Sequence, residues 1–426
     1  MLRSDRIPEE WIKREKTFLL NLCLQTALHE RETIQTTVEK VLSLSEVYQG
    51  RKWDLLLDLY SHVKDYETQT GRSVLPALQT VYQSAPAVWS IDLSERKVSL
   101  LLEVLKLQPE KKPVQLKGWS DEESEVRSFL QCLPYISQLS FYLSWSDPSK
   151  LIKFLVGLLS QAAEWEEQSG EKTLKLVSSV CTYTTFPFCD EDDYDESFQC
   201  DFLLNLYSHV KDYETQTGRS VLPALQPLYQ SAPAVWSIDL RERKVSLLLE
   251  VLKLQPEKKS IELKGWSDEE IELRIFLQCL PYISQLRFAP PQDQIGSPEE
   301  WRKREKTFLL NLCLQTALHE RETIQTTVEK VLSLSEVYQG WKWDLLLDLY
   351  SHVKDYETQT GRSVLPALQT VYQSAPAVWS IDLSERKVSL LLEVLKLQSE
   401  MKPVELWDWS DEVRSFLQCL PYISQL

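Results

Sequence analysis

The fold is decided by residues 89–141, which read WSIDLSERKVSLLLEVLKLQPEKKPVQLKGWSDEESEVRSFLQCLPYISQLSF. Three short apolar segments recur in this stretch, at spacings of 23 and 25 residues: Ile91-Asp92-Leu93, Val114-Gln115-Leu116 and Leu139-Ser140-Phe141. Between them, in 98–105 and 126–133, apolar residues recur at the three- and four-residue intervals of a helix face. Because a return to a parallel strand needs a crossover of about a dozen residues, the spacing predicts short parallel strands that alternate with helices.

Two features further from this stretch extend the pattern. Leu174-Lys175-Leu176 follows the third segment after 35 residues and predicts a fourth strand. Gly71 and Gly170 each follow an apolar helical stretch, at the position where a helix end favours a residue with positive φ. We therefore predict that each glycine ends a helix.

Longer helical stretches occupy residues 9–48 and 54–69 and their copies. These stretches have two interpretations. They form the helices of long, atypical repeats, with Val41-Leu42-Ser43-Leu44 as a strand, or they are helical insertions. In either case helix should exceed strand over the whole chain.

The large-scale organisation of the chain is a tandem duplication. Residues 9–139 recur at 299–426 with seven differences over 128 aligned positions and a deletion of residues 123–125. Residues 54–139 recur again at 201–286, with 11 differences over 86 positions. We predict repeat copy one at 1–139, a connecting repeat with an acidic loop at 140–200, a short copy two at 201–288, a proline-rich linker at 289–298 and copy three at 299–426.

A single strand–helix unit cannot bury its own apolar stripe, whereas stacked units share one continuous core. The predicted fold class is therefore α/β: a helix-rich solenoid of short parallel strands alternating with helices, built from three tandem copies. Solenoids need polar caps at their ends. Copy one and copy three both begin with the same Pro-Glu-Glu-Trp sequence, at Pro8 and Pro298, without a separate cap. We therefore expect self-association through the uncapped repeat ends.

One part of this pattern resembles a known family. Val114-Gln115-Leu116, the turn Trp119-Ser120-Asp121-Glu122 and the helix at 126–133 resemble a leucine-rich repeat of the ribonuclease-inhibitor type, as do residues 404–420. That type has an L-x-L strand, a small-Asp-Glu turn and a V-R-x-L-x-x-x-L helix. The asparagine or cysteine that follows the strand in that family is absent here, and Trp119, Trp266 and Trp409 stand near its place.

The resemblance carries implications for fold and function. Such repeats form the sensor arrays of NACHT-type innate immune receptors, and the resemblance implies that this chain is a leucine-rich-repeat region of a relative of those receptors. It further implies a cytoplasmic sensor or scaffold that binds proteins.

The charge balance excludes several classes of partner. The net charge is 47 − 63 = −16, whereas binding nucleic acid or an anionic membrane by bulk charge needs a positive surface. The sequence has no apolar run of 18 residues and its charged N-terminus does not resemble a secretory signal. It also has no N-x-S/T sequon. We therefore expect a cytoplasmic protein that binds neither nucleic acid nor membrane.

The sequence carries no motif for catalysis or for a cofactor. It has no P-loop, no G-x-G-x-x-G, no G-x-S-x-G and no H-E-x-x-H. Its eight cysteines form no C-x-x-C, and most lie in apolar helical stretches, so we interpret them as buried, reduced thiols. Cys181, Cys189 and Cys200 flank the acidic segment 190–196, which we interpret as a loop without a metal. We predict no enzyme activity, no cofactor and no metal.

The candidate binding surface is the sheet face opposite the core. In an L-x-L strand the leucines face the core, so the residue between them and the one after should face the concave surface. The predicted partner-binding residues are Asp92, Gln115, Lys117, Asp239, Glu262, Lys264, Asp382, Glu405 and Trp407. Trp407 is the sharpest candidate because tryptophan is a frequent hot-spot residue and copy one has Lys117 at that position.

These observations predict a non-catalytic protein-recognition array with an unidentified protein ligand. Two alternatives remain open from the sequence. The first is an all-α helical-repeat scaffold with a structural role, which a set of parallel strands would exclude. The second is a duplication product without a selected function, which poor solubility of the chain would favour.

Overall fold

The computed structural model describes the chain at residues 9–48, 52–84, 88–94, 98–142, 148–181, 196–241, 245–289, 298–335, 338, 342–374, 378–382, 388–408 and 413–426. The chain forms two compact units, Met1–Ala232 (unit 1) and Pro233–Leu426 (unit 2). The boundary falls inside copy two, between its helices and its first strand. The sequence copies and the compact units therefore do not coincide.

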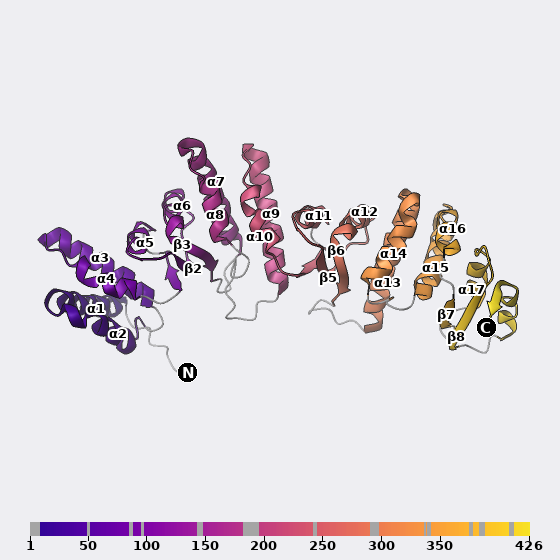
Figure 1. The fold of residues 1–426 in the computed structure, drawn as a ribbon, viewed down its shortest axis with the longest axis horizontal. Coiled ribbons are helices and arrows are strands. Elements are labelled where there is room, and N and C mark those ends of the chain that lie inside the picture. The colour runs from indigo at the N-terminus through magenta and orange to yellow at the C-terminus, as the bar shows by residue number, and fades with distance from the viewer. Residues whose placement is uncertain are drawn as a thin grey trace. The chain divides into compact units, whose positions relative to one another are not determined.

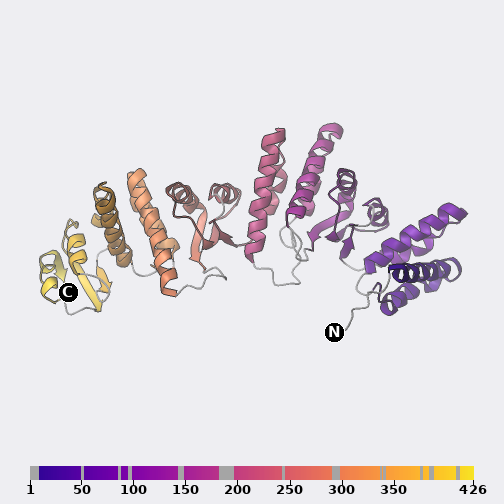
Figure 2. The same cartoon turned by 180° about the vertical axis from the view of Figure 1, so that it is seen from behind.

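Unit 1 contains one sheet and four helix pairs (Figure 1). Copy one supplies α1 (Glu9–His29), α2 (Ile34–Leu44), α3 (Lys52–Thr70), α4 (Leu75–Gln83), β1 (Trp89–Asp92), α5 (Val98–Leu105), β2 (Lys112–Gly118), α6 (Glu123–Leu130), a 3-10 turn (Leu133–Tyr135) and β3 (Ile136–Phe141). It is followed by α7 (Pro148–Ser169), α8 (Thr173–Val180), α9 (Glu196–Thr217) and α10 (Leu222–Gln230). The α7–α8 pair lies beside α6 and β3 in both ribbon views (Figure 1, Figure 2).

Unit 2 contains the two remaining sheets and two helix pairs. It begins with β4 (Val235–Asp239), α11 (Val245–Lys253), β5 (Lys259–Gly265), α12 (Glu270–Cys279), a 3-10 turn (Leu280–Tyr282) and β6 (Ile283–Phe288). Copy three supplies α13 (Pro298–His319), α14 (Ile324–Leu334), α15 (Lys342–Thr360), α16 (Leu365–Gln373), β7 (Trp379–Asp382), α17 (Val388–Leu395), β8 (Lys402–Asp408), α18 (Val413–Phe416) and β9 (Ile423–Gln425). Residues 290–297 of the predicted linker lie outside the described residues, but α12 and α13 on either side of it pack together.

Three strands from each copy pair in parallel, in the orders β1-β2-β3, β4-β5-β6 and β7-β8-β9. In copy one, Trp89 pairs with Val114, Ile91 with Leu116, and Val114 with Leu139, and all five side chains are buried. This alternation confirms the strands predicted around Ile91, Val114 and Leu139. The chain is a helix-rich α/β protein, so the all-α alternative is wrong.

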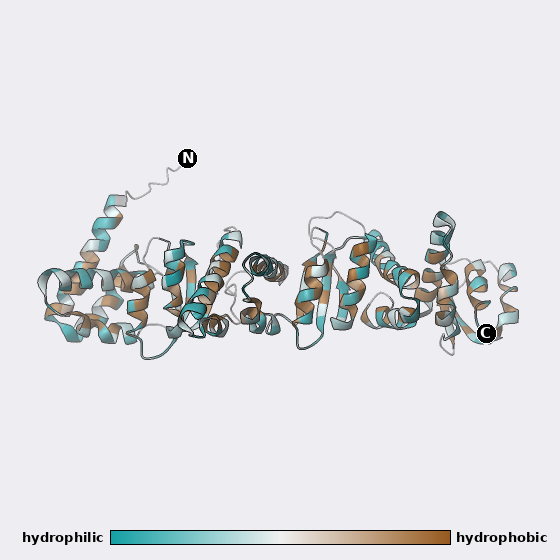
Figure 3. Cartoon of the chain, turned by 90° about the horizontal axis from the view of Figure 1, so that it is seen from above, coloured by the Kyte–Doolittle hydropathy of each residue, from teal (hydrophilic) through white to brown (hydrophobic). Residues whose placement is uncertain are grey.

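The predicted strand at residues 174–176 is wrong, and so is the interpretation of the long helical stretches that made residues 41–44 a strand. Leu174-Lys175-Leu176 lies in α8, and Val41-Leu42-Ser43-Leu44 ends α2. The physical reason is that the buried residues in both segments recur at helical intervals, and these faces pack against a neighbouring helix pair: α8 against α10, and α2 against α4. A short apolar run does not by itself distinguish a strand from a helix segment. Figure 3 shows hydrophobic and hydrophilic residues side by side along the helices of the chain.

The helix ends predicted at glycine are confirmed. Gly71 and Gly170 have φ of 69° and 72° and follow α3 and α7 directly. A glutamate one turn earlier secures the next helix. Glu67 accepts the backbone N–H groups of Val74 and Leu75, which would otherwise lack a partner at the start of α4. Glu166, Glu214 and Glu357 repeat this contact.

Gly118 ends β2 opposite Asp92, whose carboxylate must shift to make room for any side chain at residue 118. A Cβ atom at Gly118 would overlap with Asp92 Oδ1. That oxygen accepts hydrogen bonds from the Ser94 N–H (2.9 Å) and the Ser94 hydroxyl (2.5 Å), which hold the turn after β1. Copy three has Asp408 at this position, paired with Asp382 across the strands.

Gly118→Asp is therefore expected to lower the free energy of unfolding of unit 1 by about 1–3 kcal/mol, because it displaces the Asp92 carboxylate and sets two carboxylates side by side. Asp408→Gly should stabilise unit 2 by about 1 kcal/mol for the converse reason. Urea denaturation with a hydrogen-exchange readout for each unit measures both changes. Ser124→Asp, which adds the same charge at an exposed position, is the control. An equal effect of the two aspartates in unit 1 would contradict the crowding at Gly118.

Candidate protein-interaction surfaces

The first candidate surface is the strand face opposite the core. All nine predicted binding residues lie on strands: Asp92 on β1, Gln115 and Lys117 on β2, Asp239 on β4, Glu262 and Lys264 on β5, Asp382 on β7, and Glu405 and Trp407 on β8. The structure thus brings these residues together in three sets, one per sheet. The alternate residues of the same strands are core residues, so the face is set by the two-residue period of a strand.

In copy one the strand face is polar and accessible to solvent. Gln115 is half-buried between Ser90 and Ser140 on the neighbouring strands, and Lys117 is exposed. The Lys117 ammonium lies 5.8 Å from the ring centroid of Tyr142, a cation–π distance. Asp92 has a structural task on this face, since its carboxylate accepts hydrogen bonds from Ser94 in the following turn.

In copy two the corresponding face is more strongly charged. The Ser237 hydroxyl donates a 2.7 Å hydrogen bond to Glu262 on the next strand. Glu262 pairs with Arg287 on β6, where copy one has Ser140. Asp239 forms an ion pair with Arg241, the residue that replaces Ser94. The same backbone therefore presents a different arrangement of charges in each copy.

In copy three the corresponding face is described in part. Glu405 is exposed on β8, where copy one has Gln115. Asp382 and Trp407 are placed on β7 and β8, and their side chains lie outside the described residues, as does Trp409. The prediction that Trp407 contacts a partner stays a prediction.

The second candidate surface is an aromatic contact between repeats, which the sequence analysis missed. In unit 2 the ring of Phe308 on α13 lies among three rings: Trp266 at 5.4 Å, Phe276 at 5.3 Å and Phe288 at 5.9 Å between centroids. Arg304 adds a cation–π contact at 5.5 Å from Trp266. The helix pair α13–α14 thus packs against the preceding copy by inserting one phenylalanine among its rings.

Unit 1 repeats this contact with a different sequence. Phe154 on α7 lies among Trp119, Phe129 and Phe141, at centroid distances of 5.9, 5.7 and 6.0 Å. These three residues correspond to Trp266, Phe276 and Phe288, whereas α7 shares little sequence with α13. The signal in the sequence was the Trp-Phe-Phe set that copies one and two share.

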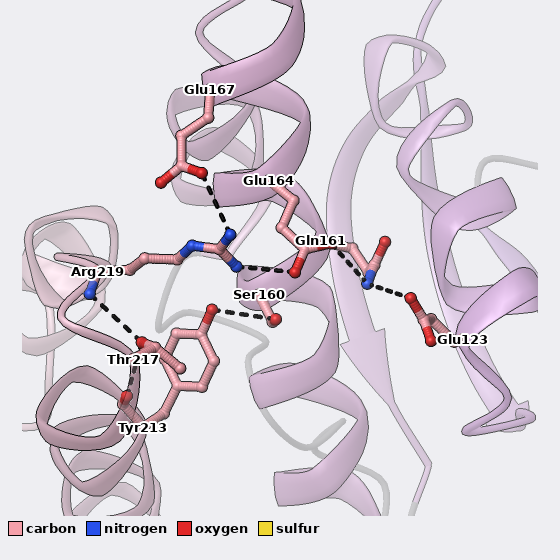
Figure 4. A network of polar contacts seen from close by, with 8 residues as sticks. All are labelled: Glu123, Ser160, Gln161, Glu164, Glu167, Tyr213, Thr217 and Arg219. Atoms are coloured by element: carbon pink, nitrogen blue, oxygen red, sulfur yellow. Dashed lines mark hydrogen bonds and ion pairs between the residues drawn. The ribbon is translucent and has the colours of Figure 1, made fainter.

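A polar network joins the connecting helix pair to its neighbours in unit 1 (Figure 4). Arg219, just after α9, pairs with Glu164 at 2.7 Å and with Glu167 at 3.2 Å, both on α7. On the other side of α7, Gln161 donates a 3.0 Å hydrogen bond to Glu123 on α6. These contacts fix α7 between α6 and α9, so the connecting repeat is packed on both sides.

The described residues show how the candidate metal ligands and thiols are placed. No group of three His, Cys, Asp or Glu among them is placed to hold a metal. The seven described cysteines are free and buried, and burial raises the pKa of Cys132, Cys181, Cys279 and Cys313 to about 12. Such thiols are poor nucleophiles. Cys189 and the acidic segment 190–196 lie in or border residues outside the described ranges.

Comparisons with known proteins do not identify a family. No protein-family model matches the chain, and a search of curated proteins finds no match. Within the described residues, no helix is both long and apolar enough to cross a membrane.

Proposed function

We propose that this chain is a non-catalytic protein-recognition array whose strand faces bind a protein ligand. The proposal rests on the positions at which the copies differ. Three of the seven differences between copies one and three fall in the seven-residue strand β2: Gln115/Glu405, Lys117/Trp407 and Gly118/Asp408. Three of the 11 differences between copies one and two fall there as well: Pro113/Ser260, Val114/Ile261 and Gln115/Glu262.

The mechanism follows from this variation on a constant backbone. Each strand face carries its own combination of residues, so each copy selects a different part of a ligand. Binding by several copies at once raises the overall affinity, because each further contact is intramolecular. The resemblance to leucine-rich repeats supports a sensor or scaffold related to NACHT-type receptors, and the free thiols fit a cytoplasmic location.

A charge-reversal experiment tests the role of the strand face. The triple variant Gln115→Lys, Glu262→Lys, Glu405→Lys changes one accessible strand residue in each copy. Immobilised wild-type chain retains binding proteins from a cell extract, and quantitative mass spectrometry measures each of them. We expect the amount of each retained protein to fall about tenfold or more, because an added or reversed charge in an interface costs on the order of 1–4 kcal/mol.

The matched control uses the equivalent exposed loop residue of each copy, five positions earlier: Glu110→Lys, Glu257→Lys, Glu400→Lys. This control adds nearly the same positive charge beside the same strands and should retain the wild-type set of proteins. Equal retention by the strand-face variant would contradict the proposal. If wild type retains nothing beyond a bare matrix, the duplication-product alternative is favoured.

A further inference from the structure

Two helix pairs of nearly identical sequence have different surroundings. Residues 9–48 and 299–338 differ at one position, yet Phe18 is 67% exposed and its counterpart Phe308 is 2% exposed. Leu44 is 82% exposed and Leu334 is 3% exposed. The α1–α2 pair therefore leaves uncovered the apolar surface that α13–α14 buries. We call it the head face: Trp11, Phe18, Leu22 and Leu44.

In unit 2, a neighbouring surface covers the corresponding helix pair, α13–α14. The preceding α12 and β6 receive the phenylalanine, and Leu286 on β6 forms a parallel bridge with Ser335, directly after α14. His319 at the end of α13 lies 2.7 Å from the carboxylate of Glu270 on α12. The surface that fits the head face is thus the helix and last strand of a repeat copy from this same chain.

Copy three exposes its own version of that surface. Leu417, Leu420 and Leu426 are 58%, 43% and 67% exposed, and we call them the tail face. Their counterparts in copy one are Leu130, Leu133 and Leu139, which are buried where α7 and α8 contact α6, the 3-10 turn and β3. The chain therefore carries the helix pair of this internal contact and an accessible apolar part of its partner surface, in which Phe416 stands at the position of Phe276 and no residue matches Phe288.

We infer that two copies of this chain associate head to tail, with the α1–α2 head face of one molecule docked on the α18–β9 tail face of another. The inference is independent of the ligand of the strand face. A second copy is the fitting occupant because a contact between nearly identical residues already exists at α12–α13. The contact joins different surfaces of the two molecules, so it is heterologous and leaves one head and one tail free in each dimer.

The contact between molecules has one polar partner fewer than the internal one. The three-residue deletion in copy three removes the counterpart of Glu270, the residue that His319 contacts in unit 2, so His29 lacks this partner on the tail face. The net charge of −16 on each molecule also opposes association, and added salt screens this repulsion. Association should therefore depend on concentration and should strengthen between low and moderate salt.

Sedimentation velocity over a concentration series tests the inference with the full chain. Wild type is expected to show a rising weight-average mass. Phe18→Glu should weaken association on the order of 100-fold, because it places a charge in the centre of the apolar head face. The tail variant Leu417→Glu, Leu426→Glu should do the same. Ile271→Glu, at a residue on α12 that is 68% exposed and belongs to neither face, is the matched control and should associate as wild type does.

Mixing the two variants separates a head-to-tail contact from a symmetric one. Each variant alone should be monomeric, whereas a mixture should form one-to-one complexes and nothing larger, because one intact head meets one intact tail. Circular dichroism of each variant should match wild type, since all three substituted residues are exposed.

Several results would overturn the inference. They are a wild type that stays monomeric at every concentration, a Phe18→Glu chain that associates as wild type does, and a tail variant that dimerises alone. The last result would indicate a head-to-head contact.

Discussion

Replacing Phe308 with alanine is expected to lower the free energy of unfolding of unit 2 by about 3–5 kcal/mol. Phe308 is 2% exposed and lies among Trp266, Phe276 and Phe288, so its removal leaves a cavity in the contact between α13 and the preceding sheet. The loss of stability is the transfer free energy of the ring plus the cost of a cavity that the three rigid rings cannot fill. Hydrogen exchange of unit 2 peptides under increasing urea measures the change.

The duplication supplies a control of the same residue type in nearly the same sequence. Phe18→Ala removes the same side chain from α1, where the ring is largely exposed, and should change stability by less than about 0.5 kcal/mol. Phe154→Ala in unit 1 should behave like Phe308→Ala, because Phe154 occupies the equivalent set of rings. Similar effects at Phe18 and Phe308 would show that the ring set does not stabilise the contact between repeats.

The sequence was sufficient to predict the alternation of strands and helices. The spacing of Ile91, Val114 and Leu139 leaves room for one helical crossover each time, and the observed strands pair in parallel at these residues. Glycine was equally informative, because Gly71 and Gly170 ended helices as predicted. These signals are local, since each depends on the chemistry of a few neighbouring residues.

The sequence was insufficient where packing decides the structure. Leu174 and Val41 lie in apolar runs that fit a strand or a helix, and contact with a neighbouring helix pair selected the helix. Phe18 and Phe308 show the limit most clearly. Their sequence context is nearly identical, and only the presence of α12 and β6 beside one of them determines that it is buried.

The sequence predicted the candidate surface only in part, as it did the fold. Strand alternation placed all nine candidate residues on strands, because a two-residue period fixes which side of the sheet a residue faces. It did not reveal that Asp92 holds the turn at Ser94, since that contact depends on the irregular pairing at Gly118. It also missed the head face, because exposure of an apolar helix depends on its neighbours.

Trp53→Cys is expected to lower the free energy of unfolding of unit 1 by about 3–5 kcal/mol, as for other large-to-small changes of a buried aromatic residue. Trp53 on α3 is 5% exposed, stacks on Trp89 of β1 at 4.0 Å between centroids, and donates a 2.8 Å hydrogen bond to the Val88 carbonyl. It therefore connects a helix pair to the sheet.

Cys200, directly before copy two, aligns with Trp53, which makes Trp53→Cys a test of whether the copies are interchangeable at this contact. The stack recurs in copy three, where Trp343 lies 4.3 Å from Trp379, so Trp343→Cys should cost unit 2 a similar amount. Trp11→Cys, at an exposed tryptophan, should cost less than about 0.5 kcal/mol. Urea unfolding followed by hydrogen exchange in each unit distinguishes these results. If Trp53→Cys lowers the free energy of unfolding no more than Trp11→Cys does, this stack does not hold the helix pairs to the sheets. In that case the cysteine at position 200 needs no compensating substitution elsewhere.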